Sequence, residues 1–151
     1  MLKTKRPHLI TEQVDDYKIL NEVDGVYKIA VPWRLHEAQV LAGLRVKEVP
    51  SPMTRDYSYT GRYEPFDHQK ETASFLTLHK KAFCFNEQGT GKTASVIWAV
   101  DYLMQQDKVK RVLVICPLSI MKSAWQEDLF KFAMHRTCSV AHGASNTRRK
   151  I

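Results

Sequence analysis

Cysteine is scarce in this chain of 151 residues, and the cysteines are not spaced for pairing. Cys84, Cys116 and Cys138 each lie in an apolar run without C-x-x-C spacing, which favours buried thiols over disulfides or zinc ligands. A run of about eighteen apolar residues is also lacking, and no apolar segment follows the basic residues 1–6. We therefore expect no membrane span, no signal peptide and a cytoplasmic location.

Acidic residues are in the minority, since 16 Asp and Glu face 23 Lys and Arg and give a formal net charge of +7. Up to Tyr63 there are ten basic against eight acidic residues, and from Glu64 onward thirteen against eight. The excess therefore lies mainly in the second part of the chain. It fits a polyanion as partner, although a basic surface that serves only solubility is the alternative.

The first 63 residues predict a small α+β unit behind a leader. Residues 1–16 show no periodicity and are expected to be flexible. Two alternating segments, 17–20 and 26–31, flank Asp24-Gly25 and predict a β-hairpin. A short helix follows from residue 35, and residues 45–49 could return as a strand before a connector that extends to Tyr63. We expect an accessory domain over 17–63 and no catalytic constellation in it.

From residue 64 onward the pattern is that of an α/β fold with a parallel sheet. Apolar runs at 82–85, 111–116 and 137–141 predict strands, and each of the first two leads into an amphipathic helix. A further helix is expected from residue 64, before the first of these strands. This alternation predicts right-handed crossovers and a ligand at the carboxyl ends of the strands.

Residues 86–93, Asn-Glu-Gln-Gly-Thr-Gly-Lys-Thr, lie between the first predicted strand and its helix. Glycines allow backbone N–H groups to turn toward a phosphate, and the helix N-terminus adds its dipole there. A lysine then reaches the β/γ-phosphates, and the next hydroxyl holds Mg²⁺. The pattern G-x-x-x-x-G-K-[ST] has glycine where this chain has Asn86. A surface turn with a solvated lysine is the alternative, but the position between strand and helix favours a phosphate-binding loop.

Three separate pieces resemble one family in the right order. They are Phe-Asp-His-Gln at 66–69, the loop at 86–93, and the run 112–120 with Ala-Trp-Gln-Glu at 124–127. Together they resemble the opening motifs of Swi/Snf-type double-stranded DNA translocases of helicase superfamily two, over residues 64–143. The resemblance implies the first part of a RecA-like P-loop lobe across residues 64–151. Short proteins of this kind are familiar from bacteriophages, which implies the cytoplasm of a bacterium or of a phage-infected host.

The resemblance also implies roles for particular residues. Gln69 resembles the glutamine that binds the adenine edge, and Thr93 resembles the threonine that holds Mg²⁺ through the nucleotide. The expected nucleotide contacts are Gln69, Gly89, Thr90, Gly91, Lys92 and Thr93. The expected contacts with the phosphates of double-stranded DNA are Pro117, Leu118, Ser119 and Lys122. ATP and Mg²⁺ are the cofactors that the family implies.

An ATP motor also needs a carboxylate pair after a further buried strand. Glu127-Asp128 lies inside a predicted helix and Asp15-Asp16 precedes the hairpin, so neither pair fits. We therefore expect an N-terminal part of a translocase that ends before the Walker B motif, needs the remainder of its motor, and does not hydrolyse ATP by itself. The alternative is a non-catalytic module whose N-terminal α+β unit binds nucleic acid or a partner. A nucleotide kinase or switch is disfavoured by the segment from Pro117 to Glu127.

Overall fold

The computed structural model describes residues 1–148, which form two compact units. Unit 1 comprises residues 1–57 and 74–82, and unit 2 comprises residues 58–73 and those from 83 onward. Helix α4 (Asp67–Leu78) belongs to both, since its first turns lie in unit 2 and its last turn in unit 1. In the described part of the chain, no helix has both the length and the apolar character needed to cross a membrane.

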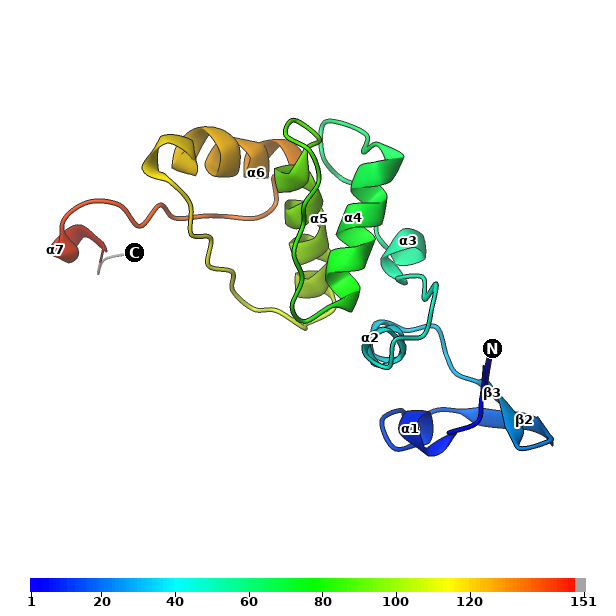
Figure 1. Ribbon diagram of the computed structural model, residues 1–151. Coiled ribbons are helices and arrows are strands. Elements are labelled where there is room, and N and C mark those ends of the chain that lie inside the picture. Colours follow the sequence, from blue (N-terminus) through cyan, green and yellow to red (C-terminus); the bar gives the residue numbers. More distant parts are fainter. Residues whose placement is uncertain (149–151) are drawn as a thin grey trace. The chain divides into compact units, whose positions relative to one another are not determined.

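A three-stranded antiparallel sheet forms the base of unit 1 (Figure 1). Strand β3 (Val26–Ala30) lies between β1 (Leu2–Thr4) and β2 (Lys18–Val23). Asp24 and Gly25 connect β2 to β3 with φ values of 51° and 71°, the left-handed conformation that a two-residue hairpin turn requires. The predicted hairpin is confirmed.

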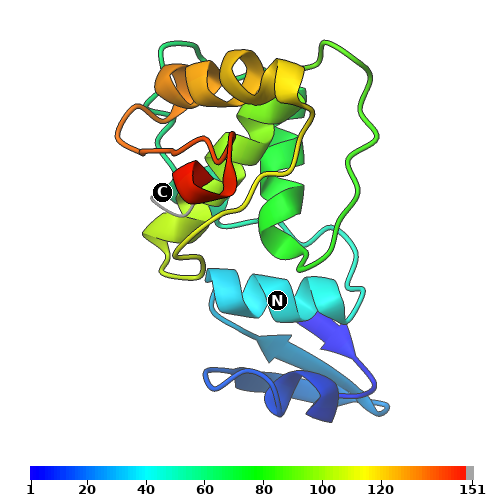
Figure 2. The same ribbon diagram turned by 90° about the vertical axis from the view of Figure 1, so that its left-hand side faces the viewer.

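Two helices pack on one face of this sheet (Figures 1 and 2). Ile10 from α1 (His8–Thr11) and Leu41 from α2 (Leu35–Gly43) join Val14 and Ile29 in one apolar cluster. Residues 1–16 were expected to be a flexible leader. They instead supply β1, α1 and the buried Val14, because even a short apolar segment is stabilised where it can cover a sheet.

The segment after α2 forms turns, so the strand expected at 45–49 is wrong. Arg45 and Glu48 have φ values of 59° and 55°, which a strand cannot accommodate. The chain then enters α3 (Met53–Asp56) through a buried Ser51 whose hydroxyl lies 2.7 Å from that of Thr77.

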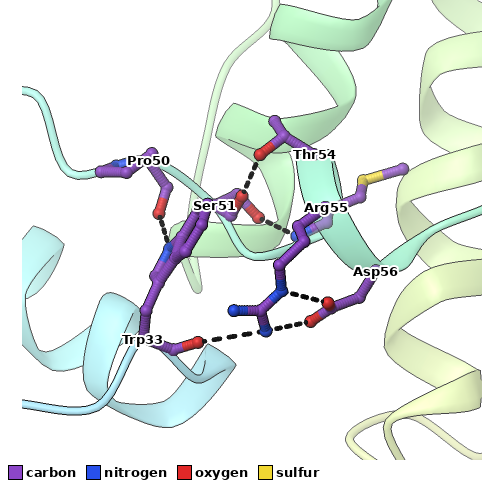
Figure 3. A network of polar contacts seen from close by, with 7 residues as sticks. Trp33, Pro50, Ser51, Thr54, Arg55 and Asp56 are labelled. Carbon is purple, nitrogen blue, oxygen red and sulfur yellow. Dashed lines mark hydrogen bonds and ion pairs between the residues drawn. The ribbon is translucent and has the colours of Figure 1, made fainter.

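Polar contacts hold the segment that leads into α3 (Figure 3). The indole N–H of Trp33 donates to the Pro50 carbonyl at 2.9 Å, and the Arg55 guanidinium lies 4.8 Å from the centre of the Trp33 ring. The Arg55 hydrogen bond to Asp56 lowers the pKa of that carboxyl. The segment from Pro50 to Asp56, expected to be part of a connector, therefore makes specific contacts within unit 1.

Unit 2 is built around helix α5 (Lys92–Gln105). Trp98 of α5 is 1% exposed and packs edge-to-face against Phe132 of α6 (Glu127–Phe132), with 5.1 Å between ring centres. Tyr59 contacts the same indole from the connector, at 5.3 Å. The buried Asp101 accepts hydrogen bonds from His135 and Arg136, which ties the chain after α6 to α5.

The rest of unit 2 consists of short helices and extended segments. A 3₁₀ turn η1 (Leu118–Ile120) and a π-helical stretch η2 (Met121–Gln126) lead into α6, and α7 (Ser145–Arg148) is the last described element. The predicted helix after Pro117 is thus confirmed, although its first part is not α-helical.

The parallel sheet predicted for this part is not confirmed, because the sheet that residues 1–148 form is the antiparallel one of unit 1. The segments 82–85, 111–116 and 137–141 lie outside any strand. Phe85 is 88% exposed and Ile115 is 89% exposed. An apolar run indicates that a segment can be buried in a sheet, but strand pairing also needs neighbours with free N–H and C=O groups.

Replacement of Ile29 by alanine tests the unit 1 core. Ile29 is fully buried, so Ile29→Ala should lower the free energy of unfolding by about 2–5 kcal/mol in a urea titration followed by circular dichroism. Ile19, its cross-strand partner, is 47% exposed, and Ile19→Ala should cost about 1 kcal/mol or less. Equal losses in the two variants would contradict the described packing.

Candidate functional site

The loop 86–93 turns sharply before helix α5. Gly89 and Gly91 have φ values of 84° and 76°, a region that side-chain-bearing residues rarely adopt. Gly91 occupies the position just before the first helical residue, Lys92. The two glycines therefore supply the backbone conformation that the sequence pattern requires, and the N-terminus of a 14-residue helix follows at once.

The ammonium group of Lys92 closes the loop. Its Nζ donates to the carbonyl oxygens of Asn86 at 2.9 Å and Glu87 at 2.8 Å. The hydroxyl of Thr90 donates to the same Glu87 carbonyl at 2.8 Å. The cationic group that the sequence assigns to the β/γ-phosphates is thus already directed into the loop rather than into solvent.

Gln69, near the start of α4, contacts the loop directly. Its Nε2 donates to the Thr90 carbonyl at 3.1 Å, and its Oε1 accepts from the backbone N–H of Phe66 at 3.0 Å. A Cβ atom added to Gly91 would lie 2.1 Å from Gln69 Nε2. A side chain at position 91 would therefore force the Gln69 amide to move, in addition to the backbone strain of a positive φ. The structure brings together Gln69, Thr90, Gly91 and Lys92.

Two contacts of this site were not predicted from the sequence. His68 Nε2 lies 3.1 Å from the Thr90 carbonyl, and Asn86 donates through Nδ2 to the Thr72 hydroxyl at 2.8 Å. The second contact explains the residue that departs from the general loop pattern, since Asn86 fastens the loop to α4. The signal in the sequence was the four-residue spacing of His68 and Thr72. In a helix this spacing places the two side chains on the same face.

Thr93 lies half-buried in the first turn of α5. In the described residues, no group of three or more His, Cys, Asp or Glu side chains could hold a metal ion by itself. A single hydroxyl fits Mg²⁺ all the same, because this ion keeps several waters and takes most of its other ligands from nucleotide phosphates.

The segment with the expected DNA contacts forms the start of the η1–η2 helix. Pro117, Leu118, Ser119 and Lys122 are all exposed. Ser119 lies inside η1, and its side chain caps neither η1 nor η2. The hydrogen bonds of the described residues do not connect this segment with the loop 86–93.

Comparison with known proteins identifies the family. Residues 68–150, more than half of the chain, match the SNF2-related domain. The chain belongs to the SNF2-related family. The match begins within α4 and includes Gln69, the loop 86–93 and the segment 117–122, and it implies the RecA-like α/β architecture of SNF2 domains. The predicted family is thereby confirmed.

One zebrafish protein is similar to a large part of this chain. The Danio rerio protein "DNA excision repair protein ERCC-6-like" is 30% identical over 97 residues, which cover 60% of this chain. The chain spans about 7% of the length of that relative. No solved structure matches the chain. Neither comparison bears on a phage origin, which stays a prediction.

A double-mutant cycle tests the contact between Gln69 and Gly91. Gly91→Ala should lower the free energy of unfolding by about 1–2 kcal/mol for the left-handed backbone alone, and further because Cβ displaces the Gln69 amide. In a Gln69→Ala background only the backbone part should remain. Urea titrations of the four variants should therefore give a coupling of about 0.5 kcal/mol or more. Strict additivity would contradict the close approach.

Proposed function

We propose that this chain carries the nucleotide-binding part of an SNF2-type, ATP-dependent DNA translocase. Its loop at 86–93 binds the phosphates of ATP, and its segment at 117–122 contacts the backbone of double-stranded DNA. The proposal unites a site whose geometry suits phosphate with a family that uses such sites in motors.

The observation that carries the proposal is the position of the Lys92 ammonium group. It is held by two carbonyl oxygens at the start of the loop, while left-handed glycines and a helix N-terminus complete the turn. A triphosphate can exchange these carbonyl contacts for charge-assisted contacts with phosphate oxygens, which are roughly twice as strong as neutral hydrogen bonds. A surface turn with a solvated lysine would not hold its ammonium in this way.

Gln69 and Thr93 complete the proposed nucleotide site. Mg²⁺, when bound with ATP, would be held by the Thr93 hydroxyl together with phosphates and water, and would neutralise charge on the phosphates. The Gln69 amide can offer both a donor and an acceptor to an adenine edge. Because it already bonds to the Thr90 carbonyl, the same residue would connect base recognition with the phosphate loop.

The apolar segments that lie outside strands fit the same proposal. We infer that 82–85, 111–116 and 137–141 become strands of a parallel sheet within a larger RecA-like lobe. Their exposed side chains, among them Phe85 and Ile115, would then be covered on both faces.

We also infer that residues 1–151 bind ATP without hydrolysing it at a useful rate. The carboxylates nearest to a Walker B pattern, Glu127 and Asp128, lie in the first turn of α6. Asp128 forms an ion pair with Lys131 at 2.9 Å and raises the pKa of that lysine. This carboxylate is therefore engaged in a helical pair instead of following a buried strand, where Mg²⁺ would be held.

Titration with a fluorescent ATP analogue and Mg²⁺ tests the phosphate-binding claim. Lys92→Ala should weaken binding about ten- to a hundredfold, because a hydrogen bond to a charged group contributes about 1.5–3 kcal/mol. The matched control is Lys108→Ala, since Lys108 is exposed just beyond the opposite end of α5. The control should bind like the unmodified chain, and equal affinity of the Lys92 and Lys108 variants would refute the proposal.

A salt titration tests the proposed DNA contact. Lys122→Gln should lower the affinity for duplex DNA by a similar factor for every sequence and reduce the slope of log K against log salt by about 1. The same slope before and after substitution, measured by fluorescence anisotropy, would remove Lys122 from the DNA interface.

A further inference from the structure

The sheet of unit 1 has one covered and one open face. Ile29 points into the cluster formed with α1 and α2, so its neighbours on β3, Lys28 and Ala30, point to the opposite face. Within unit 1, both α1 and α2 belong to the Ile29 side (Figure 1). The open face lies outside residues 68–150, so the family match does not assign it a role.

Polar donors form a row across this open face. Lys28 is directly opposite Lys3 of β1 and, on its other side, opposite Asn21 of β2. Lys18 of β2 is paired with Ala30 and therefore faces the same way, one row along the sheet. Lys3 and Lys18 are exposed and Lys28 is half-buried. Neighbouring strands lie about 4.8 Å apart, so the side chains of three lysines and one asparagine start from the same side of a small sheet. A register shift between Ile19 and Asn21 separates Lys18 from Asn21 along β2.

This arrangement opposes the stability of the sheet. Like charges placed directly opposite each other on neighbouring strands destabilise the pairing, and Lys3 faces Lys28 in this way. None of the ion pairs found in the described part of the chain involves Lys3, Lys18 or Lys28. A bound polyanion would remove this repulsion.

The acidic residues of the same segment are placed elsewhere. Residues 1–30 contain five basic and five acidic side chains, so composition alone shows no patch. Glu22 is paired with Tyr27, on the covered side of the sheet, and its hydrogen bond raises the pKa of that phenol. Asp16 forms an ion pair with Arg34. Glu12 and Asp15 lie in the segment before β2, and Asp24 lies in the hairpin turn. The acidic residue within the strands, Glu22, therefore lies on the face opposite to Lys3, Lys18 and Lys28.

We propose that the open face of the β1–β3–β2 sheet is a docking surface for the phosphate backbone of duplex DNA, with Lys3, Lys18, Lys28 and Asn21 as its contacts. Lysine and asparagine side chains are common phosphate ligands, and a cluster of ammonium groups on one face of a sheet has a charge complementary to the phosphates of a duplex. The choice of DNA among polyanions rests on the proposed function of unit 2. The surface shares no residue with the proposed ATP site.

The test measures affinity for a fluorescein-labelled duplex with the full 151-residue chain, from about 50 to about 200 mM KCl. The triple variant Lys3→Gln, Lys18→Gln, Lys28→Gln should bind more weakly and should reduce the slope of log K against log salt by about 3. Triple replacement by arginine should restore the slope. Circular dichroism and thermal unfolding should show no loss of stability, since the Lys3–Lys28 repulsion is removed.

The matched control removes the same charge from other exposed sites of unit 1, through Lys47→Gln, Lys80→Gln and Lys81→Gln. It should change the slope much less than the sheet variant. An equal effect of the two triple variants would overturn the proposal, because net charge alone would then account for binding. Undetectable binding of the unmodified chain to duplex DNA would also overturn it.

Two additional measurements distinguish DNA binding at this face from nucleotide binding and from membrane binding. Lys92→Ala should lose nucleotide affinity while retaining the sheet-dependent salt slope, so that failure of the ATP proposal and failure of this one are distinguishable. Sedimentation with phosphatidylserine–phosphatidylcholine vesicles tests a membrane as the partner. Sheet lysines that matter for vesicles and not for duplex DNA would contradict the assignment.

Discussion

The geometry of the loop depends on the Lys92 ammonium group and the two carbonyl oxygens that hold it. Without a cation at this point, the carbonyls of Asn86 and Glu87 would converge with no donor between them. With it, the loop is closed before any ligand arrives, and less conformational entropy is lost on binding. Under the proposed function, a phosphate would compete with these two carbonyls, and its full negative charge would give it the advantage.

Helix α4 is the second constraint on the same site. Gln69 and His68 reach the Thr90 carbonyl from its first turn, and Thr72 accepts from Asn86 one turn later. The loop is therefore fastened to two helices, to α5 by chain continuity and to α4 by side chains. Gly91 permits this because a side chain there would meet the Gln69 amide. The contacts with α4 therefore constrain the loop residues whether or not a ligand is bound.

The sequence predicted those features that depend on local backbone chemistry. Asp24-Gly25 predicted the hairpin, and the glycines before Lys92 predicted the loop and the start of α5, because few residues adopt positive φ. Features that depend on distant partners could not be predicted in this way. The runs 111–116 and 137–141 are apolar enough for strands, yet pairing depends on neighbours that periodicity does not reveal. The contact of Asn86 with Thr72 and the charged face of the sheet likewise require the register between segments far apart in the chain.

The central claim is that the backbone of residues 89–93 forms a cradle for nucleotide phosphates. Amide chemical shifts of the ¹⁵N-labelled chain, recorded with and without Mg²⁺ and ATP, test it at the atoms concerned. We predict that the N–H resonances of Gly89, Thr90, Gly91 and Lys92 shift on addition of Mg·ATP. Tripolyphosphate should reproduce most of these shifts. The amide resonances of Ile29 and its neighbours in β3 should not change. Unchanged loop amides at saturating nucleotide would contradict the account.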